Sequence, residues 1–374
     1  MSHTKARVLP LLVLVGAATG WARGVHADPL TLPPPVNING GPLGTLSAQG
    51  IVSGMWSDSS APNGSNPRNR FEASNAFVIL QKTTGELQFY VQAGAYAFPS
   101  VGVPRATTTT YTNLFGPVPE AYLKLVPNSE WSFEAGKLAT MIGQESTYTY
   151  LNFNIQRGLV WNDMENAVSR GVQANYANGP VSAALQVSDG FYSKNYGAVE
   201  AMVGYSLSPT NTVSFVALVP DRNTPSNPTS TDANAQLYNL MWTYSTGPWV
   251  LAPYLIAMDS PASSSAGFTG SAHASGAVFL ASYSFTKRWS LGSRLEYATS
   301  SGDAGSANSN ILGYGPDSKA WTLTFTPTYQ DQGFFARAEA SYVRAVDFAP
   351  GSAFGSLGTN ANQFRIAMET GLMF

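Results

Sequence analysis

The sequence predicts an all-β fold, a single antiparallel transmembrane β-barrel of about sixteen strands, with fourteen or eighteen as the alternatives. Apolar and polar side chains alternate with a period of two in one segment after another, which is the period of a strand and not of a helix. In residues 363–374 the even-numbered positions, from Phe364 to Phe374, are mostly aromatic or aliphatic, whereas Arg365 and Glu369 lie on the other side. Short and long connections also alternate between the segments, which is typical of barrels that cross a membrane.

The composition agrees with such a barrel. Charged residues make up 11% of the chain, aromatic residues 12%, and the mean hydropathy is −0.06; soluble domains carry about a quarter charged residues. No run of about twenty apolar residues predicts a membrane helix. The absence of cysteine excludes a disulfide framework and a thiolate site. No composition shift or long linker divides the chain, so one large domain is expected.

Residues 1–27 are predicted to be a cleaved signal peptide. Lys5 and Arg7 precede an apolar run from Val8 to Ala18, and Val25-His26-Ala27 resembles a cleavage site with small residues. The run is too short to span a bilayer easily. Cleavage removes three of the 20 basic residues and none of the 22 acidic ones, so the mature chain is acidic by five charges. This balance excludes a nucleic-acid-binding surface of the usual basic kind.

The rest of the chain divides into a lead and a barrel. Residues 28–44 are rich in proline and show no helical or strand period, so they are predicted to be a short periplasmic lead before a barrel at 45–374. Alternation predicts strands at 45–56, 71–82, 86–97, 119–126, 131–138, 170–177, 181–188, 198–206, 212–219, 235–244, 249–257, 274–285, 289–298, 320–329, 334–343 and 363–374.

The predicted connections between strands fall into two classes by length, short turns and long loops. Tight hairpin turns are predicted at 83–85, 127–130, 178–180, 208–211, 246–248, 286–288 and 330–333. Long loops are predicted at 57–70, 98–118, 139–169, 189–197, 220–234, 258–273, 299–319 and 344–362. Short turns on the periplasmic side and long loops outside are the arrangement of a bacterial barrel, and an even number of strands returns both termini to the periplasm.

Aromatic residues mark both ends of the predicted strands, where Trp and Tyr prefer the boundary between water and lipid. Next to the short turns stand Trp131, Tyr176, Tyr205, Trp242, Tyr244, Trp249, Tyr283, Phe285, Trp289, Tyr329, Phe334 and Phe374. Toward the long loops stand Trp56, Phe98, Tyr297, Trp321, Tyr342 and Phe364. The two sets are interpreted as two girdles.

In layout the chain resembles the general porins of Gram-negative outer membranes, through sixteen strands, a long third loop at 139–169 and a terminal Phe374. More specifically, it resembles the OmpL-like β-barrel porin family through Gly136-Lys137-Leu138, Gly143-Gln144-Glu145, Asn152-Phe153-Asn154 and Arg170-Gly171-Val172 before Ala174-Asn175-Tyr176. These motifs cover about a tenth of the chain. The Pro-Phe and His elements expected of that family between Leu159 and Arg170 are missing.

Charged residues on the polar side of the strands are expected to line a water-filled lumen, since each would cost a few kcal/mol against lipid. They are Glu86, Glu120, Lys124, Glu134, Glu200, Arg294, Glu296, Arg337, Glu339, Arg365 and Glu369. Four are basic and seven acidic, which predicts a mild preference for cations.

Two interpretations of these charges remain open. In one, they form a charged constriction opposite the third loop, whose Glu145, Arg157, Asp163 and Glu165 fold inward. In the other, acids and bases merely neutralise one another on a solvated wall. Three of the four bases lie on the last four strands, which slightly favours a field across the lumen.

The sequence favours no enzyme. The mature chain has one histidine, His273, with Ser271, Ser275 and Asp259 as the only candidates for a hydrolytic group. A lone surface histidine is the simpler interpretation. No metal-ligand spacing, phosphate loop or G-x-G-x-x-G motif is present, so no cofactor or metal is expected.

The resemblance implies a porin in the outer membrane of a Gram-negative bacterium, through which small hydrophilic solutes diffuse passively. Its implied partners are outer-membrane lipid, the barrel-assembly machinery acting on the strand that ends at Phe374, and two further copies in a homotrimer. Two alternatives remain. Tyr90, Tyr96 and Tyr122 on the polar side suit a channel selective for sugars, and long loops suit an adhesin or structural barrel plugged by its own loops.

Overall fold

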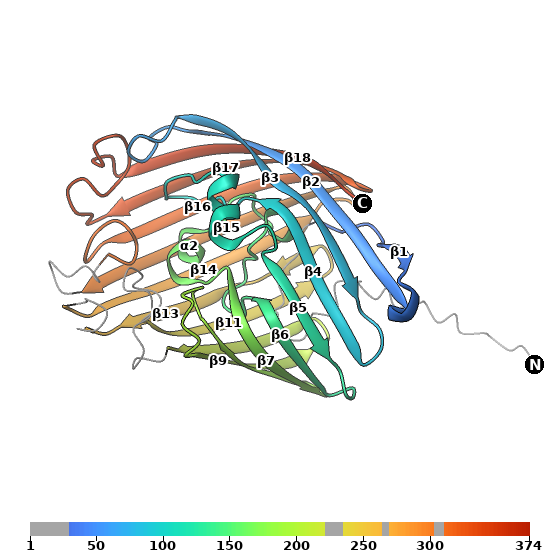
Figure 1. Cartoon of the computed structure of the whole chain (residues 1–374). Helices are drawn as coiled ribbons and strands as arrows, with labels where there is room; N and C mark the ends of the chain where they lie inside the picture. Colours follow the sequence, from blue (N-terminus) through green and yellow to red (C-terminus); the bar gives the residue numbers. More distant parts are fainter. Residues whose placement is uncertain (1–29, 221–234, 264–268, 303–309) are drawn as a thin grey trace, which may run out of the picture.

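The computed structural model describes residues 30–220, 235–263, 269–302 and 310–374. Its strands wrap into a barrel (Figure 1). They are β1 (Val36–Asn39), β2 (Thr45–Ser59), β3 (Asn69–Lys82), β4 (Leu87–Tyr96), β5 (Glu120–Leu125), β6 (Trp131–Ala139), β7 (Val168–Asn178), β8 (Val181–Ser188), β9 (Ala198–Ser208), β10 (Asn211–Val219), β11 (Gln236–Thr246), β12 (Trp249–Leu251), β13 (Tyr254–Ser260), β14 (Ala272–Ser284), β15 (Trp289–Gly302), β16 (Lys319–Asp331), β17 (Phe334–Val346) and β18 (Asn362–Met373).

The barrel is closed by its last strand. β18 pairs with β2 in antiparallel register from Arg365 opposite Ser59 to Met373 opposite Ile51. Phe374 continues the seam, because its N–H donates to the Gly50 carbonyl over 3.0 Å and its carbonyl accepts from the Gly50 N–H over 2.7 Å. Since β12 and β13 together form one wall strand and β1 stands outside the wall, the barrel has sixteen strands. The predicted fold class is confirmed.

The side chains alternate across the wall as a period of two requires. In β17, Phe334, Ala340 and Tyr342 are exposed, whereas Arg337 and Glu339 between them are buried. Large apolar side chains cover the outer face of most strands, among them Val203, Phe215, Leu240, Leu255, Phe279, Leu295, Leu323 and Phe325. The outer face is therefore apolar, as in a barrel in lipid. Inward positions are mostly polar on β15–β18, whereas on β10, β11, β13 and β14 they are mostly apolar and form a core with the third loop, as at Val216, Leu237 and Ile256.

Three local features differ from the prediction. The lead contains β1, which pairs with the start of β2, so residues 28–44 are not wholly irregular. The predicted strand at 249–257 is interrupted at Ala252 and Pro253, because proline has no N–H to donate to the ladder. Phe98 is 2% exposed and packs inside the barrel, so it does not belong to the outer girdle.

The described helices are short. η1 (Gly41–Leu43) lies in the connection between β1 and β2, and α1 (Thr108–Phe115), η2 (Thr149–Leu151) and α2 (Leu159–Met164) lie in long connections. None of the described helices is long and apolar enough to cross a membrane. The predicted signal segment 1–27 and most of the predicted loop at 220–234 lie outside the described residues.

Candidate functional site

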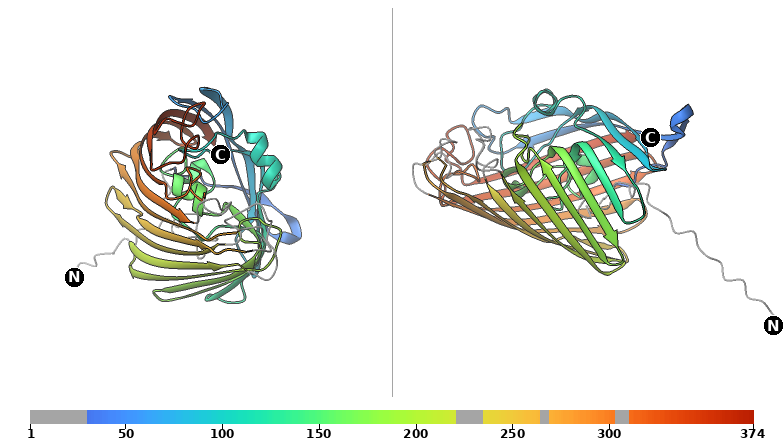
Figure 2. Two further views of the ribbon diagram at one scale, coloured as in Figure 1. Left: turned by 90° about the vertical axis from the view of Figure 1, so that its left-hand side faces the viewer. Right: turned by 60° about the horizontal axis from the view of Figure 1, so that its bottom comes forward.

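The third loop, residues 140–167 between β6 and β7, lies inside the barrel. The view along the barrel shows α2 and its flanking segments within the ring of strands (Figure 2). Nearly all of its side chains are buried, including Glu145, Arg157 and Trp161. The lumen is therefore divided by a segment of the chain itself, and the contacts of that segment determine what is left open.

One anchor joins the loop to β15. Nη1 of Arg294 donates to Glu145 Oε1 over 2.7 Å and to the Gln156 carbonyl over 2.6 Å, while its Nε lies 3.4 Å from Glu296. Glu296 in turn accepts from the backbone N–H groups of Leu159 and Val160, and Glu145 accepts from Gly158. Carboxylates thus satisfy the first free N–H groups of α2, as acidic groups commonly do at a helix N-terminus.

A second anchor joins the loop to β17 and β18. Glu339 accepts from the Ile155 N–H over 2.5 Å and from Gln156 Nε2 over 2.8 Å. Arg337 forms an ion pair with Glu369 and donates to the carbonyls of Thr149 and Asn152, each over 3.0 Å. The inward charges of the last strands therefore hold the loop against the wall.

Glycines in the wall make room for this docking. A methyl group at Gly292 would lie 2.3 Å from the Phe153 carbonyl oxygen. A methyl group at Gly276 would lie 2.9 Å from a Val160 methyl. Because both glycines are on inward positions of β14 and β15, the wall is shaped to the loop and not only bonded to it.

The structure brings seven of the eleven predicted lumen residues to the third loop: Glu200, which meets the backbone of Met141, and Arg294, Glu296, Arg337, Glu339, Arg365 and Glu369. On the other wall, Lys124 pairs with Glu134 over 3.0 Å, and Glu120 is buried. Glu86 differs from the prediction. It is exposed in the turn before β4, because that strand begins one residue later than expected.

The four predicted loop charges are all at most 9% exposed. Glu145 is bonded to Arg294, and Asp163 accepts from Asn162 Nδ2 over 2.8 Å. Burial raises the pKa of the Glu165 carboxyl well above its usual range. Burial lowers the pKa of Arg157 to about 10, and the guanidinium carbon lies 5.6 Å from the ring centroid of Phe98 and 5.1 Å from that of Trp161. The third loop thus lies inward, as the first interpretation expects, and six wall charges of β15, β17 and β18 bond to it; the charged constriction itself stays a prediction.

A second loop, residues 97–119 between β4 and β5, lies against the third. Ser100 and Arg157 form a parallel bridge, in which Val101 N donates to the Arg157 carbonyl and Arg157 N donates to the Pro99 carbonyl. Its Phe98 joins an aromatic cluster with Tyr96, Tyr148 and Trp161. The two loops therefore form one unit within the lumen.

Sequence comparison identifies the family. Residues 45–374 match the profile of the family described as "Putative beta-barrel porin-2, OmpL-like". The chain belongs to this porin family. It is an outer-membrane channel of Gram-negative bacteria by family and fold. No curated protein sequence matches the chain.

Solved structures share the fold of this porin at low sequence identity. The outer membrane channel DcaP of Acinetobacter baumannii is 12% identical, covers 88% of this chain and 97% of its own, and superposes with a TM-score of 0.57. In-vitro folded OmpT of Vibrio cholerae, an outer membrane protein described in its trimer form, is 10% identical, covers 88% of this chain and 99% of its own, and has a TM-score of 0.57. At such identities the likeness shows the fold alone.

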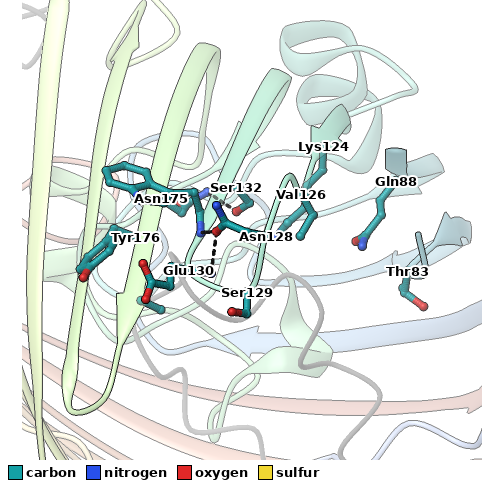
Figure 3. Close-up of a pocket in the computed structure, with 12 residues that line it drawn as sticks. Thr83, Gln88, Lys124, Val126, Asn128, Ser129, Glu130, Ser132, Asn175 and Tyr176 are labelled. Atoms are coloured by element: carbon teal, nitrogen blue, oxygen red, sulfur yellow. Dashed lines mark hydrogen bonds between the residues drawn. The ribbon is translucent and has the colours of Figure 1, made fainter. Parts of the chain in front are cut away.

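The wall of the porin opposite the anchors carries polar side chains. Gln173 and Asn175 of β7 bond to each other over 2.7 Å, Ser132 accepts from Asn175, and Gln186 donates to Ser188. At the short-turn end of this wall, a cavity of about 170 Å³ is lined by Gln88, Lys124, Ser132 and Asn175 together with the turn 128–130 (Figure 3). A polar surface therefore continues from this cavity into the barrel.

Sequence reasoning missed several residues that shape the lumen. Asn75 donates to Thr149, Asn239 accepts from Gly143, and Gln156 links Glu339 to Arg365. Arg105 is 9% exposed and donates to carbonyls of residues 57, 67 and 68. The alternation of the strands predicts that Asn75 and Asn239 face inward, but the sequence analysis named only charged residues as lining the lumen. Gln156 and Arg105 lie in loops without a period, so no pattern could have found them.

Proposed function

We propose that this porin lets small hydrophilic solutes cross the outer membrane passively, along the polar wall of β6–β8 that faces the third loop. The proposal rests on a difference between two walls of the barrel: one binds the third loop, and the other does not. Arg294, Arg337 and Glu339 hold the loop against β15–β18. Most of the loop's bonds to strands are made there and to β3 and β11, and the polar side chains of β7 and β8 bond mainly to one another. A solute path is expected on the wall to which the loop is not fastened.

The proposal includes a mild preference for cations. Without Glu86, which is exposed in the turn before β4, the charged residues named from the sequence for the wall and the third loop are nine acidic and five basic. If Glu165, whose pKa burial raises, is counted as neutral and the buried Arg105 is added, eight acidic and six basic residues remain. An excess of negative charge in a narrow channel raises the local concentration of cations. Reversal potentials measured under a KCl gradient are expected to show K⁺ crossing more readily than Cl⁻, and a preference for Cl⁻ would contradict the proposal.

A second candidate, a channel selective for sugars, is favoured by one observation. Tyr90 and Tyr122 stack inside the barrel with ring centroids 5.5 Å apart and planes inclined by 16°. Stacked aromatic faces suit the apolar faces of sugar rings. If this candidate is right, a maltodextrin will reduce the single-channel current at millimolar concentration, and Tyr122→Ala will remove that block. General diffusion predicts no such block.

Planar-bilayer recording of the purified, folded protein tests the main proposal. Discrete conductance steps are expected. The conductance of a step should fall progressively as larger solutes enter the channel from one side. A folded barrel that never produces steps would instead favour the adhesin or structural barrel that its own loops plug. Export by a cleaved signal peptide, recognition of the Phe374 strand by the assembly machinery and a homotrimeric state are parts of the same proposal.

A further inference from the structure

Three buried arginines of the lumen lack a carboxylate partner. Arg105, Arg157 and Arg365 are 9%, 0% and 2% exposed, and among the described residues none of the three forms an ion pair within 4.0 Å. Arg294 and Arg337, by contrast, are each paired with glutamate. Burial of an unneutralised guanidinium is costly, so its surroundings must supply the missing interaction.

Two of these arginines, Arg157 and Arg365, meet on the second loop. Arg365 Nη1 donates to the Ser100 carbonyl over 2.8 Å, and Ser100 is bridged to Arg157 through the backbone. Gln156 Oε1 accepts from Arg365 over 2.8 Å, and Glu339 reaches Arg365 only through this glutamine. Burial raises the pKa of the nearby Tyr111 hydroxyl, while the charges on Arg157, Arg365 and Arg70 act in the opposite direction. Arg157 and Arg365 therefore both act on Tyr111 between the second loop, the third loop and β18, where Glu145 and Glu369 act on Arg157 and Glu339 acts on Arg365.

The free hydrogen-bonding groups at this place are donors. Nε and Nη1 of Arg157, Nε of Arg365, the Ser100 hydroxyl and Nε1 of Trp161 are all buried without a partner. Trp161 stacks against Arg157 at 5.1 Å from guanidinium carbon to ring centroid. Four residues joined by direct contact thus hold five unused donor groups. Buried donors are almost always satisfied in proteins, so this concentration points to an acceptor that the chain itself does not provide.

We propose that Ser100, Arg157, Trp161 and Arg365 form a binding site for the oxyanion group of a small solute, either a carboxylate or a phosphate. Guanidinium groups match the geometry of both anions and bind them with charge-assisted hydrogen bonds. The role of the site in transport rests on the proposed channel function, but binding itself does not.

Tryptophan fluorescence of the folded protein in detergent tests the site without any current, because Trp161 lies against Arg157. Inorganic phosphate and malonate are titrated separately at constant ionic strength. A saturable change is expected with at least one of them, and Trp161→Phe should remove the signal. Arg157→Gln and Arg365→Gln are expected to weaken binding about tenfold or more. Arg344→Gln is the matched control, because it removes the same charge from an exposed, outward position of β17.

Heat-modifiable migration in gels establishes that each variant is folded. Should a glutamine variant fail to fold, Arg157→Lys and Arg365→Lys keep the charge but lose the planar fork, and weaker binding is expected in both. Absence of a saturable change in the wild type, or equal affinities in the wild type and both arginine variants, would overturn the site. Saturable binding without conductance steps would refute the channel and not the site, whereas steps without binding would refute the site alone.

Discussion

Glu145→Gln is expected to loosen the third loop without unfolding the barrel. The carboxylate accepts from Arg294 over 2.7 Å and from the Gly158 N–H over 2.8 Å. A glutamine can keep the bond to Gly158 through its amide oxygen, so the loss is one charge-assisted hydrogen bond, about 1.5–3 kcal/mol. Arg294 retains Glu296 at 3.4 Å and the Gln156 carbonyl, which is why the larger penalty of an unpaired buried charge is not expected.

A loss of about 2 kcal/mol raises the undocked fraction of the loop about 30-fold. Trypsin measures that fraction, because Arg157 lies within the loop and is 0% exposed while the loop is docked. When docking is fast relative to cleavage, the cleavage rate follows the undocked population. Folded Glu145→Gln should therefore be cut between residues 157 and 158 about 30 times faster than the wild type.

Glu86→Gln provides the control, because it removes the same charge from an exposed turn. It should be cut at residue 157 at the wild-type rate. Equal rates for all three proteins would show that the pair with Arg294 does not hold the loop, and the assignment of the wall charges as anchors would have to be abandoned.

Three further predictions concern the packing around the loop and the seam. Gly292→Ala places a methyl group 2.3 Å from the Phe153 carbonyl oxygen, so it should displace the loop and also speed cleavage at residue 157; an unchanged rate argues against the close approach. Glu165→Gln should raise Tm more at higher pH. Burial raises the pKa of this carboxyl in the native state, so the wild type loses stability as pH rises through that pKa, whereas glutamine does not ionise. A gain in Tm confined to low pH would contradict the raised pKa. Gly50→Val puts a side chain within 2.3 Å of the Phe374 ring, so the yield of heat-modifiable barrel should fall, and a wild-type yield would show that the seam tolerates it.

The strands could be predicted because lipid outside and polar groups inside impose one alternation on every wall segment. The predicted strand at 181–188 coincides with β8, and others differ by a few residues at their ends. β1 was missed because four residues between proline and glycine are too short to show a period. Inward and outward side chains continue to alternate across the break at Pro253, so the period of the sequence could not reveal that β12 and β13 are separate.

The site was only partly predictable. Parity identified Arg294 and Arg337 as inward residues, but it could not show that their partners lie in the third loop, 149 residues away in the case of Glu145. Such pairing depends on how an irregular segment folds back, and no period records that. Glu86 had the right parity but stands where the strand has not yet begun, so parity predicted its face and not its height in the barrel.

Substituted-cysteine accessibility tests the central claim most directly, since the natural chain contains no cysteine. Asn175 lies on the inward face of β7 beside the polar cavity, whereas Ala174 is on its outward face. A charged thiol reagent should reduce the single-channel current of Asn175→Cys and leave that of Ala174→Cys unchanged. Block at position 174 but not 175, or reaction at 175 with no effect on the current, would contradict a solute path along the wall opposite the docked loop.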